Sequence, residues 1–488
     1  MNIVGDFVQP STLSEHKPDR EYTKDLARFA AELRYDDLSD ELITKAIYSI
    51  QDCLGLDLYV GTQTDCGRNI AQHALRESGA DHTATVIGYG RRATPELAAL
   101  ANGTMGLGFE FEDVHMGAKT HPYATIVPAA LGIAERVGSN GHEFIAAVVA
   151  GHEIACRIGV ASRCRDSDGE HMVWRRGVYT QQVFSVFGAA VAAGKLLGLD
   201  PEGIANAMGI AGEQAAGSQQ SHDEGTWSRR LHGGLAAANG VRAALLANGG
   251  FTGPTHVLEG RYGLYTMFAL EFHPDLLMRN LGEEWEFLDV WYKAYPSYTI
   301  SHAMIESVLK LRKEHNIEPE QVDRVIGFQP RWTQSHLRTD FPTLVSVQYG
   351  PRFLLATALL RGKFGLEEVQ EETLNDERIH RFARDNVDIV LDEPYTTIRD
   401  TTPPPRTCPG GAEIVMKDGR KLKAESLYPL GSPNNPQSRD QMKAKFETLI
   451  GASKVLKESE TRELYGRIQR LEQDIPVTEV TELLCQQS

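Results

Sequence analysis

The segment Gly188-Ala-Ala-Val-Ala-Ala-Gly-Lys195 consists almost entirely of small residues, and Ile204-Ala-Asn-Ala-Met-Gly-Ile-Ala-Gly212 has a similar composition. Small side chains let helix axes approach closely, so both segments are typical of tightly packed helices. This texture runs from Leu97 to Asn248 and predicts a large all-helical domain. The first segment is not a phosphate-binding loop, because five residues instead of four separate its glycines and Leu196 stands where Ser or Thr is required.

The helical pattern continues towards both ends of the chain. Ser39 is a typical N-cap residue, and acidic residues and then an apolar helical face follow it. Ser438 and Gln441 form a capping-box pattern that begins another helix. We expect residues 22–287 and 432–488 to form the helical domain, and residues 1–21 to be a flexible N-terminal arm.

Residues 288–431 show strand patterns instead. Val322–Gln329 alternates between apolar and polar residues, Val387–Leu391 is rich in β-branched residues, and Asp418-Gly419 is a hairpin turn signal between two further runs. The predicted fold is therefore mainly α, with a large all-helical domain and a smaller α+β lid domain at residues 288–431.

A cluster of titratable residues interrupts the helical region. The stretch Glu110-Phe-Glu-Asp-Val-His-Met-Gly-Ala-Lys-Thr-His121 holds three carboxylates, two imidazoles and an ammonium between two apolar segments. Buried ionisable groups must be paired or have shifted pKa values, and such groups often form functional sites. The alternative is a solvated turn, in which His121 only opens a helix with Pro122 in its first turn.

At these residues the chain resembles the MmgE/PrpD family, which includes 2-methylcitrate dehydratase, cis-aconitate decarboxylase and iminodisuccinate epimerase. The family's acidic stretch followed by His-Pro is similar to residues 110–122. The other matching segments, in chain order, are Asp52-Cys-Leu-Gly55, Ser228–Gly240, Leu258-Glu-Gly-Arg-Tyr-Gly263, Lys293–His302, Val345–Tyr349 and Pro429–Pro436. Their shared order extends the resemblance over nearly everything after about residue 22.

The resemblance implies a cofactor-independent and metal-independent site between the two domains. The positions that match the family's catalytic groups are His121, Tyr179, Asp113 and Lys293. Those expected to bind the substrate are Glu110, Arg229, His232, Tyr298, His302 and Arg176.

These residue types suit the chemistry of polycarboxylates. Removing a proton next to a carboxylate adds charge to an anion, so the site needs cations, here Arg229 and Lys293, and a nearby base. His121 suits the role of base or acid at neutral pH, and Asp113 or Glu110 would orient its imidazole or raise its pKa.

Each of these residues also has a structural interpretation. Arg229 would then pair with a buried carboxylate, Lys293 would extend its ammonium to the domain junction, and His302 would cap or satisfy a helix.

Two positions depart from the family's pattern. Relatives that are dehydratases or decarboxylases typically carry His where this chain has Tyr179, and the decarboxylase-like members also carry His near Tyr298. A phenol donates a proton but is a poor base, since its unperturbed pKa is near 10. Arg175 and Arg176 are two further cations. They would bind an additional carboxylate of the substrate, or they are solvated surface residues.

Three functions fit these residues. The first is a lyase that removes water from a small di- or tricarboxylic acid, with His121 taking the proton and Tyr179 protonating the leaving hydroxyl; a cis-aconitate-type decarboxylase is a related possibility. The second is an isomerase or epimerase that removes and returns a proton. The third is a non-catalytic carboxylate binder.

Composition limits the class of protein further. The 488 residues are enough for two domains, and a net charge of -16 argues against nucleic acid and anionic membranes as partners. Six cysteines without metal-ligand spacing indicate reduced thiols and a cytoplasmic location, and we expect neither a signal peptide nor a membrane span. The expected partners are a small anionic carboxylate and, by the resemblance, a second copy of the chain in a homodimer.

Overall fold

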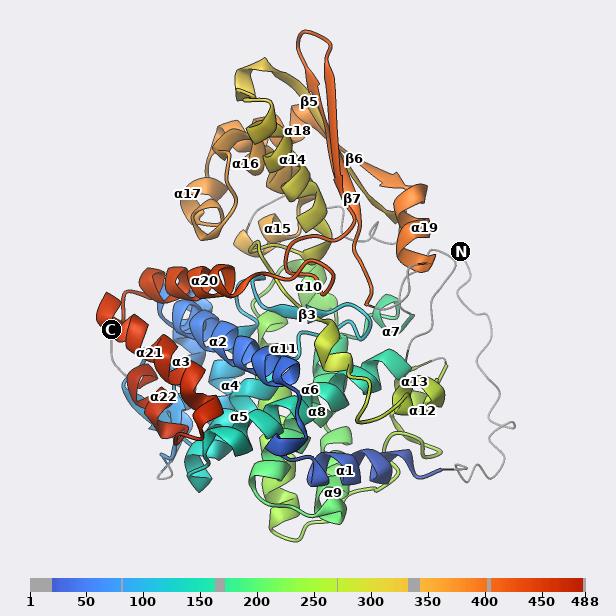
Figure 1. Ribbon diagram of the computed structural model, residues 1–488, viewed down its shortest axis with the longest axis vertical. Coiled ribbons are helices and arrows are strands. Elements are labelled where there is room, and N and C mark those ends of the chain that lie inside the picture. Colours follow the sequence, from blue (N-terminus) through green and yellow to red (C-terminus); the bar gives the residue numbers. More distant parts are fainter. Residues whose placement is uncertain are drawn as a thin grey trace.

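The computed structural model describes residues 20–79, 82–162, 172–269, 271–331, 343–401 and 405–485. Its ribbon divides into a large helical part and a small part that carries a four-stranded sheet (Figure 1). Helices, short 3-10 turns included, hold 62% of the described residues, which confirms the mainly α expectation. Residues 1–19, almost all of the predicted N-terminal arm, lie outside the described residues.

The helices and strands have the following bounds. The first half of the chain forms α1 (Tyr22–Glu32), α2 (Asp40–Gln63), α3 (Asp65–Glu77), α4 (Pro95–Gly106), α5 (Tyr123–Val137), α6 (Gly141–Ala161), α7 (Met172–Arg175), α8 (Thr180–Leu196), α9 (Pro201–Gly212), α10 (Gln220–Glu224) and α11 (Ser228–Asn248). The second half forms α12 (Leu264–Phe268), α13 (Pro274–Met278), α14 (His302–Glu314), α15 (Leu344–Gln348), α16 (Pro351–Arg361), α17 (Glu371–Leu374), α18 (Glu377–Asn386), α19 (Glu393–Thr401), α20 (Arg439–Ser453), α21 (Glu458–Gln469) and α22 (Thr478–Leu484). The strands are β1 (Ala84–Val86), β2 (Arg91–Ala93), β3 (Asp113–His115), β4 (Val290–Tyr292), β5 (Val322–Pro330), β6 (Val387–Asp392), β7 (Gly410–Met416) and β8 (Lys421–Ser426).

Small residues bring the central helices of the large part together. α8 packs against α6 and α11, and α11 also packs against α4. A side chain on Gly188 of α8 would collide with the carbonyl of Gly151 in α6, so glycine is required at this crossing. This contact confirms that residues 188–195 serve helix packing.

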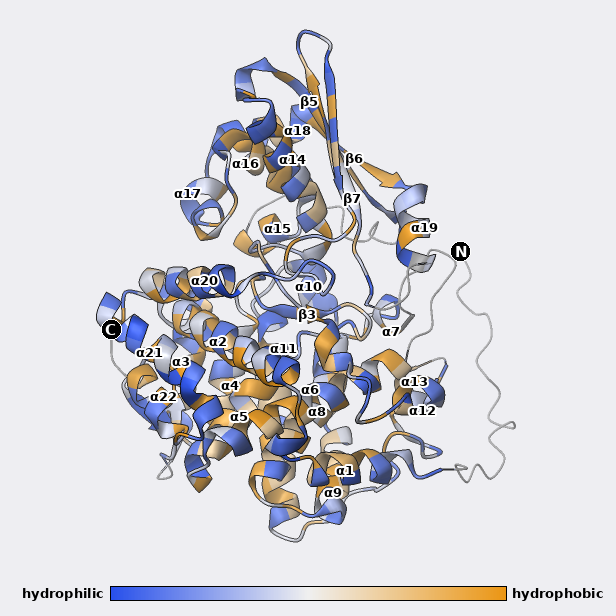
Figure 2. Ribbon diagram, viewed as in Figure 1, coloured by the Kyte–Doolittle hydropathy of each residue, from blue (hydrophilic) through white to orange (hydrophobic). Residues whose placement is uncertain are grey.

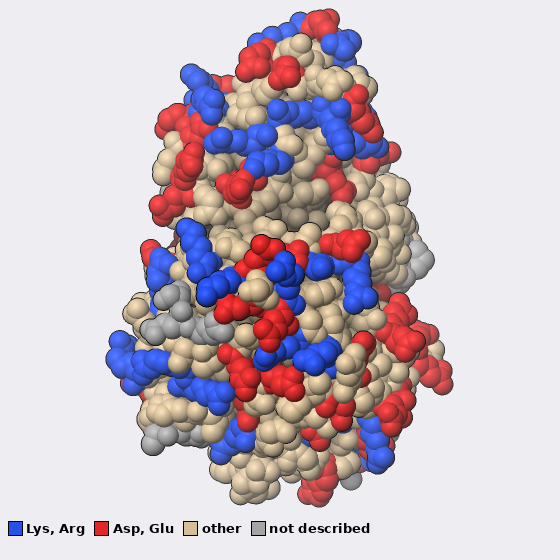
Figure 3. Space-filling model, turned by 60° about the vertical axis from the view of Figure 1, so that its left-hand side comes forward, with Lys and Arg blue, Asp and Glu red and all other residues tan. Residues whose placement is uncertain are grey.

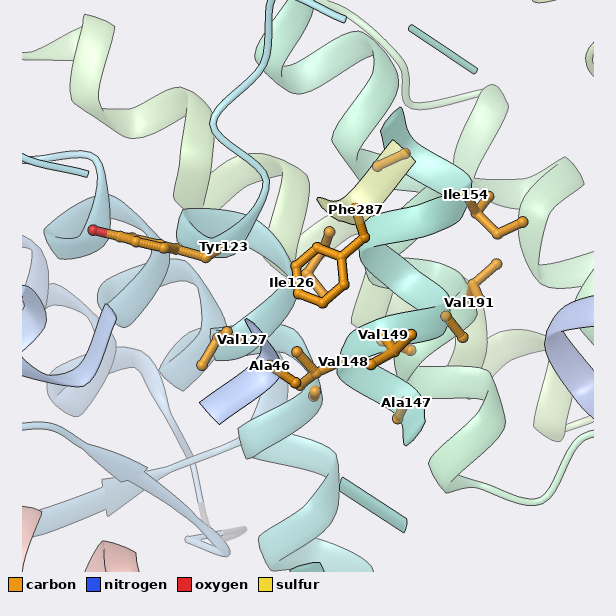
Figure 4. Close-up of a cluster of buried hydrophobic side chains, with 14 of the residues drawn as sticks. Ala46, Tyr123, Ile126, Val127, Ala147, Val148, Val149, Ile154, Val191 and Phe287 are labelled. Atoms are coloured by element: carbon orange, nitrogen blue, oxygen red, sulfur yellow. The ribbon is translucent and has the colours of Figure 1, made fainter. Parts of the chain in front are cut away.

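The core of the large part is apolar and continuous. Figure 4 shows side chains of α2, α5, α6 and α8, among them Ala46, Val127, Val148 and Val191, gathered around Phe287. Apolar residues concentrate inside the large part, and polar residues lie on its outer helices (Figure 2). α6 is long and apolar enough to cross a membrane, but its most apolar window is 100% buried inside the protein, as expected for a core helix.

The small part, α14 to α19 and β5 to β8, is built on a sheet of order β6-β5-β7-β8. β5 pairs in parallel with β6, and β7 and β8 form an antiparallel hairpin. The hairpin turns at Asp418 and Gly419, as predicted, and Gly419 has a φ of 88°, which glycine adopts without strain. The surface is hollowed along the boundary between the two parts (Figure 3).

Both predicted helix caps are present. The Ser39 side chain accepts a hydrogen bond from the Leu42 amide, and Ser438 and Gln441 form a reciprocal capping box. α20, which begins at this box, packs against α2 in the large part.

Candidate active site

A short antiparallel pairing brings the acidic stretch beside Lys293. β3 pairs with β4, and Asp113 lies opposite Tyr292. The residues just before β3 and just after β4 therefore lie at the same end of this two-stranded ribbon. Glu110 and Glu112 lie just before β3, and Lys293 lies just after β4.

Four charged side chains form what we call the ion-pair cluster: Glu110, Glu112, Arg229 and Lys293. Lys293 Nζ lies 2.9 Å from Glu110 Oε2 and 2.9 Å from Glu112 Oε1. Arg229 Nη2 lies 2.6 Å from Glu110 Oε1, and the Tyr349 hydroxyl also donates to Glu110. All four charged residues are buried, so the solvated-turn alternative is wrong.

The two carboxylates and the two cations of the cluster balance each other in charge. Burial raises the pKa of Glu110, but Arg229 and Lys293 outweigh burial, so the pKa lies well below its ordinary value. Glu110 is therefore ionised. It also has a φ of 54°, in the left-handed region that non-glycine residues rarely adopt, and strain of this kind gathers at functional sites.

His121 lies next to the cluster as a neutral base. Its Nδ1 donates to the Asp113 carbonyl oxygen at 2.5 Å and lies 3.3 Å from Glu112 Oε1. This contact leaves the Nε2 lone pair available to accept a proton. Burial and then the charge of Lys293 lower the pKa of His121, while Glu112 opposes them, so the imidazole is neutral at pH 7.

The groups that orient the His121 imidazole differ from those expected. The imidazole is held by the backbone of Asp113 and by Glu112, instead of by the carboxylates of Asp113 or Glu110. The Asp113 carboxylate accepts from the Tyr123 amide at 3.0 Å, at the start of α5, and burial raises its pKa. Gln181 bonds both the amide and the carbonyl of His121, at 2.5 and 2.9 Å.

Tyr179 lies beside Arg229. The Arg229 guanidinium lies 5.2 Å from the Tyr179 ring centre, and the His232 ring packs against it at 4.6 Å. Burial raises the pKa of Tyr179, so the phenol stays protonated. Burial, followed by Arg229, lowers the pKa of His232 to about 4, and His232 Nδ1 donates to Gln182 Oε1 at 2.8 Å.

The remaining predicted residues lie at different distances from the cluster. The Tyr298 ring packs against Tyr349 at 5.2 Å, so it joins the cluster's edge. His302 Nε2 donates to the Ser297 carbonyl at 3.3 Å, and burial lowers its pKa to about 3, which matches the structural interpretation of this residue. Arg176 is exposed, and within the described chain no contact joins it to the cluster.

Three important residues were not among the predicted site residues. Glu112 belongs to the same acidic stretch, and Tyr349 ends a segment that matched the family, so a signal existed for both. For Lys445 of α20 the sequence contains no such signal. Its ammonium donates to Asp52 Oδ2 at 2.8 Å and to the carbonyls of Phe111 and Lys293 at 2.8 and 3.0 Å.

Several buried polar atoms around the cluster lack a partner. Among the described residues, Glu112 Oε2, Tyr179 OH and Arg229 Nη1 form no hydrogen bond of normal geometry, although Arg229 interacts with the Tyr179 hydroxyl and opposes the rise in its pKa. Buried polar groups are nearly always satisfied, so these atoms make the space beside the cluster the candidate ligand site. These atoms offer one acceptor, one neutral donor and one cationic donor.

A second group of residues has the composition of a metal site. Ligand atoms of His115, Glu286 and Asp289 all lie within 4.8 Å of one another. However, His115 Nδ1 accepts the Ala118 amide proton, so Nε2 carries the hydrogen of the neutral ring and offers no lone pair. Arg279 also lies 3.0 Å from Glu286, so these residues do not fit a metal.

Known proteins match this chain over nearly its full length. The chain is 27% identical over 502 residues to a cis-aconitate decarboxylase-like protein of Aspergillus oryzae, covering 97% of this chain and 99% of that protein. It is 26% identical over 485 residues to the cis-aconitate decarboxylase of Aspergillus terreus, covering 95% of each. The identity to the mouse cis-aconitate decarboxylase is 24% over 479 residues, covering 95% of this chain and 93% of that protein.

Two family models match consecutive regions of the chain. The MmgE/PrpD N-terminal domain matches residues 24–277, and the MmgE/PrpD C-terminal domain matches residues 295–472. The first region contains Glu110, His121 and Arg229, and the second contains Tyr349. The resemblance found in the sequence is thus confirmed, and the chain belongs to the MmgE/PrpD family.

Proposed function

We propose that this protein is a lyase that acts on a small di- or tricarboxylic acid by proton transfer at a carbon next to a carboxylate. One observation carries the proposal: a neutral His121 and a protonated Tyr179 lie beside the same buried ion-pair cluster. An elimination needs a base and an acid in these two protonation states at once.

Loss of water is the reaction that uses both groups. His121 Nε2 takes the proton from the carbon, a carbon–carbon double bond forms, and the carbon–oxygen bond breaks. Tyr179 protonates the departing hydroxyl, which leaves as water. Arg229 and Lys293 stabilise the charge that develops on the neighbouring carboxylate, in a buried site where electrostatic interactions are strong.

Loss of carbon dioxide is the second candidate, favoured by the names of the relatives. Here the bond to a carboxylate breaks, carbon dioxide leaves, and Tyr179 or protonated His121 delivers a proton to carbon. The two reactions share the binding groups and differ in which bond of the substrate is placed over His121 and Tyr179.

Proton NMR in deuterated buffer tests both candidates. The purified protein is mixed with citrate, 2-methylcitrate, cis-aconitate and substituted succinates, each in a separate tube. Loss of water supports the first candidate, and loss of carbon dioxide with deuterium at the protonated carbon supports the second. Deuterium incorporation without net loss indicates an isomerase and overturns the lyase proposal.

A matched pair of variants connects turnover to the site. H121Q removes the base, while H302Q alters a buried histidine that only satisfies a backbone carbonyl. Turnover should fall at least a hundredfold in H121Q and change much less in H302Q. Binding of a panel member without any turnover or exchange would indicate a non-catalytic carboxylate binder.

A further inference from the structure

A cavity of about 790 Å³ lies where the large and small parts meet, and we call it the seam cavity. It is lined from the large part by Tyr59, Phe109 and Arg230, and from the small part by Leu344. Phe109 directly precedes Glu110, and Arg230 directly follows Arg229. The seam cavity therefore shares two chain segments with the ion-pair cluster.

Arg230 is a buried cation without an anion. The residue is 8% exposed, and among the described residues its guanidinium forms no ion pair with a carboxylate. Its hydrogen-bonding neighbour is the Cys66 thiol, whereas the neighbouring Arg229 is paired with Glu110. Burial lowers the pKa of Arg230. Burial also raises the pKa of the Cys66 thiol beside it, so this thiol is neutral and does not compensate the charge. A buried charge of this kind is costly unless something pairs with it.

The position of Arg230 in its helix adds to this cost. Arg229 and Arg230 both lie in the first turn of α11, a helix of 21 residues whose N-cap residue provides no side-chain hydrogen bond. The N-terminus of a helix is its positive end, so two cations there repel the helix dipole. Anions are needed to offset that repulsion, and the protein supplies one only for Arg229 among the described residues.

The other charges of the seam cavity are placed differently. Arg68 is already paired with Asp65 at 2.6 Å. Glu371 and Glu372 are exposed, so solvent screens them. The uncompensated positive charge is thus at the buried end, where Tyr59 and Phe109 form an apolar wall.

We propose that the seam cavity binds an organic acid, with its carboxylate on Arg230 and its apolar carbon chain against Tyr59, Phe109 and Leu344. The guanidinium fork matches a carboxylate with two parallel hydrogen bonds. The proposal concerns binding alone and does not depend on the reaction proposed above. The bound acid is either the far end of a long substrate or a separate molecule.

Octanoate is the probe, and isothermal titration calorimetry on the whole protein is the measurement. R230Q should raise the dissociation constant of octanoate about ten- to a hundredfold, the range for a lost hydrogen bond to a charged group. R230K keeps the charge without the fork and should give a smaller rise. R68Q is the matched control, because that arginine lines the same cavity but is already paired, and its effect should stay within about twofold.

Trp227 reports where the probe binds. It lines the seam cavity, is 51% exposed, and should change its fluorescence when octanoate binds, a change that W227F abolishes. The same dissociation constant in R230Q and in the unaltered protein would overturn the proposal, as would the absence of octanoate binding to the unaltered protein. If R230Q fails to fold, R230K decides by the same comparison.

Competition with cis-aconitate identifies the source of the acid. Mutual exclusion supports one continuous site, in which the cavity holds the far end of a long substrate. Simultaneous binding supports a separate acid. Both results are read by calorimetry, so a protein that binds octanoate through Arg230 but turns over no acid would retain this inference and lose the proposed function.

Discussion

The ammonium of Lys445 lies 2.8 Å from the carboxylate of Asp52, and both groups are buried. This pair joins α20 to α2. The same ammonium donates to the carbonyl of Phe111, between Glu110 and Glu112 of the cluster, and to the carbonyl of Lys293, whose side chain also belongs to the cluster. Lys445 therefore positions the ion-pair cluster without belonging to it.

Lys445→Met should lower the free energy of unfolding by about 3–5 kcal/mol, because it leaves the Asp52 carboxylate buried and unpaired. Urea unfolding measures the change. Lys443→Met is the control on the same helix, since Lys443 is partly exposed and lies 3.8 Å from Glu447, a surface pair worth about 0–1 kcal/mol. Equal stability of the two variants would contradict this account of Lys445.

Tyr179→Phe should reduce turnover about a hundredfold or more without reducing stability. The Tyr179 hydroxyl is buried and forms no hydrogen bond of normal geometry in the described structure, so its removal breaks no strong bond while it removes the proposed acid. Tyr349→Phe is the counterpart, because its hydroxyl donates to Glu110 and its loss should cost about 1–3 kcal/mol. Thermal unfolding and steady-state kinetics separate the two effects, and a destabilised Y179F protein would argue against an unpartnered hydroxyl.

The activity should rise with pH as His121 loses its proton, with a midpoint below the ordinary histidine value, because burial lowers the pKa of His121. Glu112 opposes this lowering. Glu112→Gln should therefore move the acidic limb of the kcat profile to still lower pH. An acidic limb that moves upward in E112Q would show that another group controls it.

Because of His152, the free energy of unfolding should decrease as the pH falls below 6.5. Burial lowers the pKa of His152 from 6.5 to about 3, so between these pH values the unfolded chain binds a proton that the folded protein does not. The folded state thus loses about 1.4 kcal/mol per pH unit as the pH falls below 6.5, and is unaffected above it. Urea unfolding of the protein and of His152→Met at pH 7.5, 6 and 5 should show the difference in slope. Parallel pH dependences would contradict the burial of a neutral His152.

The fold was predictable where the signals are local. The caps at Ser39 and Ser438 and the turn at Asp418-Gly419 depend on residues two or three positions apart, so a single sequence displays them. The small residues around Gly188 likewise indicate close helix crossings. The parallel pairing of β5 with β6 was not predictable, since about sixty intervening residues leave no local trace of a partner.

The site was predictable where one stretch concentrates its chemistry. The acidic stretch before His121 contains Glu110 and Glu112, and the apolar segments around them favoured burial, which the structure shows, over a solvated turn. The atoms that orient His121 were not predictable, because the Asp113 backbone carbonyl carries no signature in the sequence. Lys445 was missed for a related reason: a lysine on an amphipathic helix is usually exposed, and only the assembled fold buries it.

The place of Lys445 in the chain has a consequence for biosynthesis. A ribosome makes the chain from its N-terminus, so Glu110, His121, Arg229, Lys293 and Tyr349 are all synthesised before Lys445. Until α20 docks on α2, the carbonyls of Phe111 and Lys293 lack the ammonium that holds them together. The nascent protein thus carries every group of the cluster but gains an ordered site only when its C-terminal helices have folded.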